Sequence, residues 1–155
     1  MTVQLTTFLS MNGRAKEAIS FYQEYLEAKV LFIKNYVELK EMDPTFEFIE
    51  AEANYIAHSV LEIGGGMLMV ADEIMSANKK EIIGTNFSLC ITGEVEEIKK
   101  MYAKLNTHPN VKIVIPLEPN IFGNAYGIIE DPFGITIQLV MKNKPKSNSK
   151  NSKTC

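Results

Sequence analysis

The sequence predicts an α+β fold that contains one small module twice. Three apolar residues of the first half each have an apolar counterpart 79 positions later, in the pairs Phe8 and Phe87, Ile19 and Ile98, and Leu26 and Leu105. A glutamate also precedes a glycine by four positions in each half, at Glu62 and Gly66 and at Glu130 and Gly134. A duplicated module with its turns in register normally encloses a ligand between its halves.

The first module has a local signal for each element. After Asn12-Gly13, apolar residues recur at helical spacing. The next segment is rich in branched and aromatic side chains, which favours a strand. In order, the predicted elements are a strand over 3–11, a helix from about 15 to 26, a strand over 30–39, a connection or short helix over 41–54, and strands over 55–63 and 67–71 around Gly64-Gly65-Gly66.

The second module repeats this order. Its helix begins with three glutamates, which the positive end of the helix dipole stabilises. Its hairpin turn is Asp131-Pro132-Phe133-Gly134, with proline and glycine placed as in a type I turn. The predicted elements are a strand over 87–92, a helix from about 94 to 105, and strands over 111–115, 125–129 and 135–140.

Length and composition predict a single cytoplasmic domain. The chain has 155 residues, of which 46% are hydrophobic, enough for one domain or two half-domains that share a core. No apolar run reaches the roughly 18 residues of a membrane span. The N-terminus also lacks the basic and then apolar pattern of a signal peptide. We therefore expect no association with a membrane.

The last 14 residues are expected to form a disordered tail. Residues 142–155 hold five lysines and no acid, so removing them would change the net charge from −3 to −8. Serine, asparagine and lysine dominate this segment, which has no apolar periodicity. Lysines without arginine or aromatic neighbours more often keep a terminus soluble than bind nucleic acid, and the acidic body offers no basic groove. We expect no nucleic-acid partner.

The two cysteines do not suggest a disulfide framework. Cys90 lies in an apolar, strand-like run and Cys155 ends the polar tail. We expect Cys90 to be a reduced core residue rather than a nucleophile.

Four segments carry a resemblance to a known family. They are NGRAKEAISFY at 12–22, HSVLEIGG at 58–65, LMVAD at 68–72 and YGIIEDPFG at 126–134. Together they resemble the PhnB-like branch of the glyoxalase, bleomycin resistance and dioxygenase family, also called the vicinal oxygen chelate superfamily. The resemblance implies one domain over 1–141, with modules at about 3–73 and 85–141. It also implies that the modules form a curved, cup-like, eight-stranded mixed sheet, and that the protein is a homodimer.

The resemblance implies a divalent metal held by His and Glu side chains on inward-facing strands. Carried over residue by residue, the four ligand positions fall on Thr7, Val70, Asn86 and Gln138. Hydroxyl, amide and alkyl groups are poor ligands for Zn, Fe, Ni or Mn. We therefore predict no metal ligand and no cofactor. A different metal set, such as His58 with Glu62 or Glu130, stays open because the sequence leaves the strand register uncertain by one residue.

His58 is the candidate catalytic residue, because an imidazole can act as a general base or bind an anion. The alternative is a hydrogen-bonded structural histidine. Glu62, Glu130 and Asp72 stand at strand ends, where they either stabilise turns or act as acids. The predicted ligand-binding residues are Thr7, His58, Met69, Asn86, Phe122, Tyr126 and Gln138. The apolar members of this set could equally be core residues.

The function predicted from these features is the metal-independent binding of a small apolar or aromatic molecule. The alternative is an enzyme of the glyoxalase, dioxygenase or epimerase type that depends on a metal or on His58. A regulatory or structural role without a small molecule is a third possibility. Family membership does not choose between them, because function belongs to the site and not to the fold.

Overall fold

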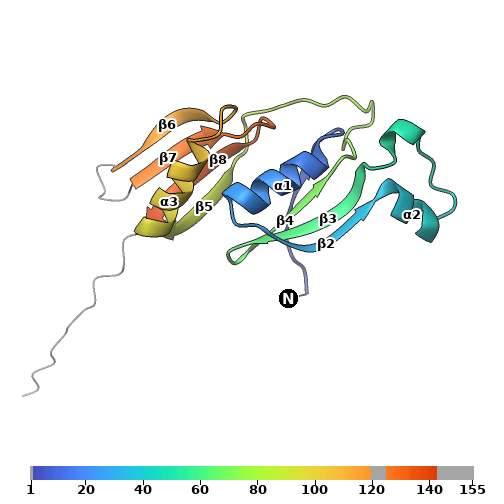
Figure 1. Cartoon of the computed structure of the whole chain (residues 1–155), viewed down its shortest axis with the longest axis horizontal. Coiled ribbons are helices and arrows are strands. Elements are labelled where there is room, and N and C mark those ends of the chain that lie inside the picture. Colours follow the sequence, from blue (N-terminus) through green and yellow to red (C-terminus); the bar gives the residue numbers. More distant parts are fainter. Residues whose placement is uncertain (1, 120–124, 143–155) are drawn as a thin grey trace, which may run out of the picture. The chain divides into compact units, whose positions relative to one another are not determined.

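The computed structural model describes residues 2–119 and 125–142. The chain divides into two compact units, Met1–Gly84 (unit 1) and Thr85–Cys155 (unit 2). The elements of unit 1 are β1 (Thr7–Ser10), α1 (Ala15–Tyr25), β2 (Lys29–Asn35), α2 (Tyr36–Met42), the short 3-10 helix η1 (Glu50–Glu52), β3 (Ile56–Ile63) and β4 (Gly66–Ala71). Those of unit 2 are β5 (Leu89–Glu94), α3 (Val95–Leu105), β6 (Lys112–Pro119), β7 (Ala125–Glu130) and β8 (Thr136–Lys142) (Figure 1).

Each unit contains a four-stranded mixed sheet, and the two sheets share one topology. The strand order is β1-β4-β3-β2 in unit 1 and β5-β8-β7-β6 in unit 2. The first and last strands of each unit pair in parallel, and the other neighbours pair antiparallel. Helix α1 lies across one face of its sheet, and α3 lies across one face of its own (Figure 1). The predicted α+β fold of two strand-helix-three-strand modules is confirmed.

The face of each sheet that carries the helix, here called the helix face, contains the core. Helix α1 buries Ala15, Ala18, Ile19 and Tyr22, and α3 buries Ile98 and Leu105. The buried strand residues are Leu9, Leu61, Leu68 and Val70 in unit 1 and Ile129, Ile137 and Leu139 in unit 2. Each such large side chain contributes about 1.5–3 kcal/mol when fully removed from water. The opposite face of each sheet has no helix of its own unit over it and is here called the open face.

Both predicted hairpins are present, with different turns. Ile63 pairs with Gly66, so a two-residue turn joins β3 to β4. In unit 2 the Gly134 amide donates to the Asp131 carbonyl over 3.1 Å, the bond expected across a type I turn. The Asp131 carboxylate also accepts from the Phe133 and Ile135 amides. Gly134 has φ of 85°, a conformation that glycine adopts at little cost.

Asp72, directly after β4, fixes the start of α1. Its side chain is only 4% exposed, and its carboxylate accepts hydrogen bonds from three backbone amides. Those amides belong to Gly13 at 2.6 Å, Ala15 at 2.9 Å and Ile56 at 2.8 Å. The negative charge lies at the N-terminus of α1, where the helix dipole favours it. Of the two roles left open for Asp72, the contacts therefore support the structural one.

Several boundaries differ from the prediction. Strand β1 has four residues rather than nine, and β5 begins at Leu89 rather than Phe87. The predicted strand over 30–39 stops at Asn35, because a helix begins there. The Asn35 side chain accepts from the Glu38 amide, and the Glu38 carboxylate accepts from the Asn35 amide, which forms a capping box. Lys142, where the predicted tail begins, ends β8, and the rest of that tail lies outside the described residues.

Between β2 and β3, unit 1 has an excursion over residues 36–55 that carries an aromatic cluster. The ring of Tyr36 lies 5.1 Å from Phe46, 6.0 Å from Phe48 and 5.7 Å from Tyr55, measured between centroids. Burial, followed by the negative charges of Glu73 and Asp72, raises the pKa of Tyr36 to about 12. In unit 2, five residues separate β6 from β7.

Among the described helices, none is long and apolar enough to cross a membrane. The longest of them have 11 residues, whereas a spanning helix needs about 20.

Candidate functional site

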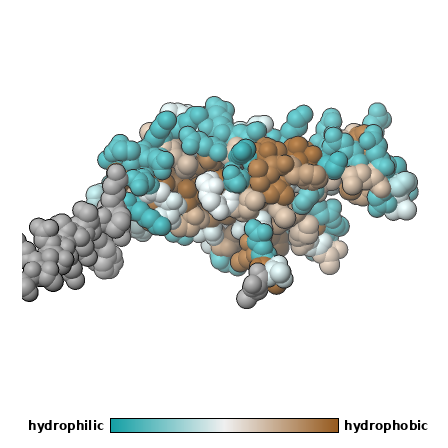
Figure 2. Space-filling view, turned by 90° about the horizontal axis from the view of Figure 1, so that it is seen from below, coloured by the Kyte–Doolittle hydropathy of each residue, from teal (hydrophilic) through white to brown (hydrophobic). Residues whose placement is uncertain are grey.

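The open face of unit 1 carries an apolar row that crosses all four strands. Strand residues alternate between faces, so residues paired across neighbouring strands share a face. Phe8 pairs with Met69, Met69 with Val60, and Val60 with Phe32. None of these four side chains is fully buried, and Phe32 is 41% exposed. Figure 2, a view of the molecule from below, shows hydrophobic residues in brown beside hydrophilic residues in teal on the surface.

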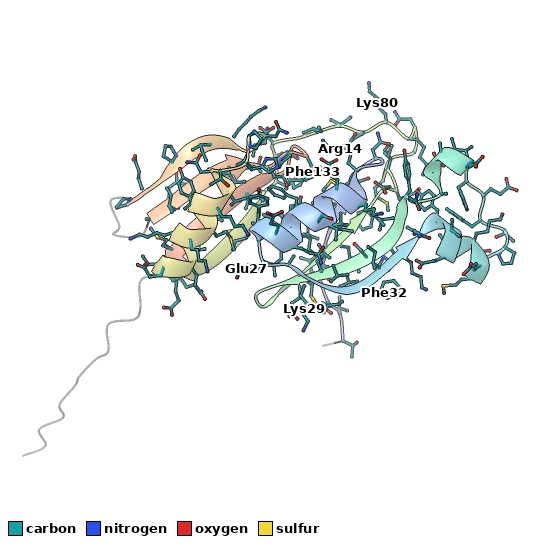
Figure 3. All side chains as sticks on the ribbon, viewed as in Figure 1. Arg14, Glu27, Lys29, Phe32, Lys80 and Phe133 are labelled. Carbon is teal, nitrogen blue, oxygen red and sulfur yellow. The ribbon has the colours of Figure 1, made fainter. Side chains whose placement is uncertain are left out.

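A basic pair adjoins this row. His58 lies on the open face two residues before Val60, and Lys34 pairs with His58. The Phe32 ring lies 5.4 Å from the imidazole of His58, and the Lys34 Nζ lies 5.8 Å from the centroid of the same ring. Figure 3 labels Phe32 part-way along β2 and Lys29 at the start of this strand. The imidazole and the ammonium can both donate hydrogen bonds to a ligand on this face.

The open face of unit 2 is more polar. Gln138 pairs with Cys90 and Ile128, so these three side chains share it, together with Tyr126 two residues before Ile128. The Gln138 Nε2 donates to the Ser88 Oγ over 2.7 Å. Gln138 therefore has a protein partner for its NH₂ group, while its amide oxygen, an acceptor, has none among the described residues. Cys90 is exposed, so the expectation of a core cysteine is wrong: its strand position faces away from α3.

Four of the seven predicted ligand-binding residues lie on the open faces: His58 and Met69 in unit 1, and Tyr126 and Gln138 in unit 2. Thr7 is not with them, because it pairs with Leu68 on the helix face. Asn86 is exposed in a bend three residues before β5. Phe122 lies outside the described residues.

The registers of the two sheets give the equivalences between the units. Leu61 pairs with Leu68, and Ile129 pairs with Ile137; all four are buried under a helix. Leu68 and Ile137 are therefore equivalent. The next residue is Met69 in β4 and Gln138 in β8, so these two residues also correspond. On the first strands, the neighbours of these two residues are Phe8 and Cys90. The carried-over positions Thr7 and Val70 lie instead on the helix face, where Val70 is fully buried.

The residues at these four corrected positions do not fit a family metal site. They supply a phenyl ring, a thioether, a thiol and an amide, and no imidazole or carboxylate. Zn, Fe, Ni and Mn favour imidazole, thiolate and carboxylate ligands. In residues 2–119 and 125–142, no group of three or more His, Cys, Asp or Glu side chains is placed to hold a metal ion.

The two glutamates that precede the hairpins stand opposite lysines. Glu62 pairs with Lys29 across β3 and β2, and Glu130 pairs with Lys112 across β7 and β6. The Lys112 Nζ lies 3.7 Å from the Glu130 Oε1, and both side chains are partly exposed. Exposed pairs of this kind contribute about 0–1 kcal/mol. The ion pair supports the strand-end role that was left open for Glu130, and Glu62 has the same register position opposite a lysine.

A hollow on the helix side of unit 2 is separate from these faces. It has a volume of about 530 Å³ and lies between α3 and the ends of β6, β7 and β8. The described residues around it include Lys99, Tyr102, Leu117 and Met141. Of the six predicted ligand-binding residues that the structure describes, none is among those that line it.

The sequence prediction omits Phe8, Phe32, Val60 and Lys34. A signal for them exists in β3, where Ser59 and Leu61 alternate with His58 and Val60. Once His58 is assigned to the open face, Val60 follows by the period of two. Lys34 could not be added in the same way, because the register of β2 against β3 shifts between Val30 and Phe32 and again after Lys34.

Comparison with known proteins agrees with this fold. The model of the Glyoxalase/Bleomycin resistance protein/Dioxygenase superfamily matches residues 4–139. Protein YjdN of Escherichia coli strain K12 is 28% identical over an alignment of 148 residues that covers 91% of this chain and 97% of that protein. A Bacillus cereus structure described as a putative 3-demethylubiquinone-9 3-methyltransferase, PhnB protein, is 25% identical with a TM-score of 0.67, over 90% of this chain and all of that one.

Protein PA1353 from Pseudomonas aeruginosa is 19% identical with a TM-score of 0.71, over 92% of this chain and 100% of that one, and this likeness concerns the fold alone. The family match covers most of the chain, and the relatives include a PhnB protein. The chain therefore belongs to the Glyoxalase/Bleomycin resistance protein/Dioxygenase superfamily, in its PhnB-like branch.

Proposed function

We propose that this protein binds a small apolar or aromatic molecule on its open faces without the help of a metal ion. The observation that carries this proposal is the row Phe8, Met69, Val60 and Phe32, which crosses a whole sheet without a helix of its own unit over it. Removing apolar surface from water contributes about 25 cal/mol per Å², so a flat aromatic molecule gains affinity by covering this row. A molecule bound on the open face of unit 2 would instead find polar contacts with Gln138 and Tyr126.

The donor chemistry supports metal independence. The open-face positions hold no carboxylate or imidazole where the family usually holds its metal, and Cys90 is the one residue among them with affinity for Zn. His58 supports the second candidate, an enzyme. It lies beside the apolar row, where it could exchange a proton with a bound molecule.

We further propose that the protein acts as a cytoplasmic homodimer. The edge strand β2 exposes Leu31, Phe32 and Ile33, each more than 40% accessible to solvent. An exposed apolar edge favours pairing with another chain. Gel filtration with light scattering should give twice the mass of one chain, and the mass of a single chain would reject the dimer.

The binding proposal is tested with N-phenylnaphthylamine (NPN), a neutral aromatic probe that fluoresces in apolar sites. Chelator-stripped protein should bind NPN, and adding Mn, Fe, Ni or Zn should leave the affinity unchanged. Met69→Asp places a carboxylate in the middle of the row and should weaken NPN binding on the order of 10-fold, since burying an unpaired charge is costly. Ile82→Asp is the matched control, because Ile82 is 82% exposed in the segment that joins the units.

NPN that fails to bind, or that binds Met69→Asp as well as the wild type, would reject the proposal. A metal that raises the thermal midpoint would favour the enzyme instead. At about 100 times its dissociation constant, an ion that binds only the folded state adds roughly 2.7 kcal/mol to the stability.

A further inference from the structure

The two ends of the apolar row in unit 1 differ in charge. At one end Lys29 stands opposite Glu62, so a cation faces an anion. At the other end Lys34 stands opposite His58, and neither is an acid. None of the ion pairs Arg14–Glu17, Lys79–Glu73 and Lys112–Glu130 includes Lys34. The Lys34 ammonium therefore has no carboxylate partner among residues 2–119 and 125–142.

The ammonium of Lys34 lies above the sheet. Its Nζ is 5.8 Å from the centroid of the Phe32 ring, which in turn lies 5.4 Å from the imidazole of His58. A cation over an aromatic ring is attracted to the negative face of the ring, which favours this placement. The charge is thus held beside the apolar row, within reach of a molecule that lies on the row.

The acids near this end have other partners or lie farther away. The Glu38 carboxylate accepts from the Asn35 amide over 2.9 Å, and the Asp72 carboxylate accepts from three backbone amides. Glu73, two residues beyond Ala71, forms an ion pair with Lys79. Glu62 is four residues from His58 along β3, a separation of about 13 Å at the usual rise per strand residue. This end of the face therefore presents positive charge and N–H donors to a ligand.

Unit 2 has the opposite character at the matching place. Tyr126 pairs with Glu118, as His58 pairs with Lys34, and both pairs lie on the open face next to the central row. A phenol and a carboxylate there replace the imidazole and the ammonium. The positive end is therefore a property of unit 1 and not of the shared fold.

We infer that the open face of unit 1 selects an amphipathic anion. The ligand has an aromatic or alkyl body that covers Phe8, Met69, Val60 and Phe32, and a single carboxylate or sulfonate that lies at Lys34 and His58. This inference rests on the proposed function, since it names the class of molecule for the same face.

The test compares two probes of nearly the same shape. Anilinonaphthalenesulfonate (ANS) has the aromatic body of NPN and adds one sulfonate. Lys34→Met keeps most of the alkyl stem and removes the charge, so it should weaken ANS binding roughly 5-fold and leave NPN binding unchanged. Lys34→Glu should weaken ANS binding on the order of 10-fold or more, because repulsion replaces attraction.

Lys16→Met is the control for net charge. Lys16 is exposed on α1, which covers the other face of the same sheet, so this change should leave the affinity for ANS unchanged. Raising the salt from about 0.05 to 0.5 M should narrow the difference between the wild type and Lys34→Met, because salt screens partly exposed charges. Circular dichroism of each variant excludes ANS binding to unfolded protein.

The outcomes separate the two proposals. The anion-selective face is supported if both Lys34 variants lose affinity for ANS and keep their affinity for NPN, while Lys16→Met keeps its affinity for ANS. If the protein binds NPN, but the wild type and the Lys34 variants have the same affinity for ANS, the inference is overturned and the proposed function still holds. A wild-type protein that binds neither probe overturns both.

Discussion

Unit 1 and unit 2 share an order of strands, yet they connect the first strand to the helix in different ways. In unit 1 a link of four residues separates β1 from α1. The Asp72 carboxylate accepts hydrogen bonds from the amide of Gly13, within this link, and from the amide of Ala15, the first residue of α1. In unit 2, β5 ends at Glu94 and α3 begins at Val95. The residue that corresponds to Asp72 is Met141, which is buried and apolar. A longer link leaves amides without partners, and a buried carboxylate satisfies them.

A second contrast lies inside the sheets. Ser59 in β3 is fully buried, and its hydroxyl donates to the carbonyl of Val70 and accepts from the Val70 amide. The corresponding residue of β7 is Gly127. A Cβ there would lie 2.9 Å from the backbone nitrogen of Leu117 and 3.1 Å from the carbonyl oxygen of Ile115. One position thus needs a hydroxyl in unit 1 and the absence of any side chain in unit 2.

Asp72→Asn tests the first contrast and should have the largest effect. The amide keeps the shape but removes the charge and turns an NH₂ group toward backbone donors, so we expect a loss of about 2–4 kcal/mol in unfolding free energy. Urea denaturation gives this value. Hydrogen exchange should rise around residues 13–15 and 56 of unit 1 more than in α3 of unit 2.

Asp43→Asn is the control for the same chemical change at an exposed turn, where the Asp43 carboxylate accepts from the amide and the hydroxyl of Thr45. It should leave exchange around residues 13–15 unaltered. Equal exchange in wild type and Asp72→Asn would mean that the carboxylate does not hold the start of α1.

Gly127→Ala tests the second contrast and should cost about 1–3 kcal/mol, the usual effect of forcing atoms into a packed strand. The clash is with backbone, which cannot rotate away as a side chain can. Gly65→Ala is the control, since a Cβ there meets nothing within 4 Å. Thermal melts of the two variants should therefore diverge, and equal midpoints would show that β6 shifts freely.

Tyr36→Phe tests the excursion of unit 1 and has the smallest effect, confined to high pH. The pKa of Tyr36 is raised to about 12, from an ordinary value of 10.0. Between these values the unfolded tyrosine loses its proton while the folded one keeps it, so stability falls as the pH rises through this range. The stability of Tyr36→Phe relative to wild type should accordingly increase from pH 8 to pH 11 in urea titrations. If the difference in unfolding free energy between Tyr36→Phe and wild type is the same at pH 8 and at pH 11, the raised pKa is contradicted.

The repeat and the helices could be predicted because their signals are local. Ile19 and Ile98 are buried at equivalent places, 79 positions apart as predicted. The first strands could not be aligned in this way. Leu9 and Ile91, which pair with equivalent core residues of β4 and β8, are 82 positions apart. The offset between the first strands thus exceeds the offset between the helices by three residues, and a single offset for the whole module therefore misplaced Asn86.

The site was predicted in part for a related reason. Each strand has a period of two, so an error of one residue exchanges the two faces, as it did for Thr7. His58 and Met69 were assigned to the correct face. Lys34 could not be found, because two register shifts in β2 separate it from any regular pattern. The capping box of Asn35 and Glu38, in contrast, is a sequence signal that would have moved the start of α2 to its observed place.

The opposite charges of Lys34 and Glu118 have an evolutionary consequence. Directly after a duplication two copies are interchangeable, and either can lose a binding residue while the other keeps it. Here the backbone is still duplicated while the side chains of the open faces are not. A chain built from two copies of unit 1 would keep the strand order and carry Lys34 twice, so both of its open faces would favour anionic groups. The present chain has a lysine on one open face and a glutamate at the matching place of the other, so its two faces favour ligand groups of opposite charge.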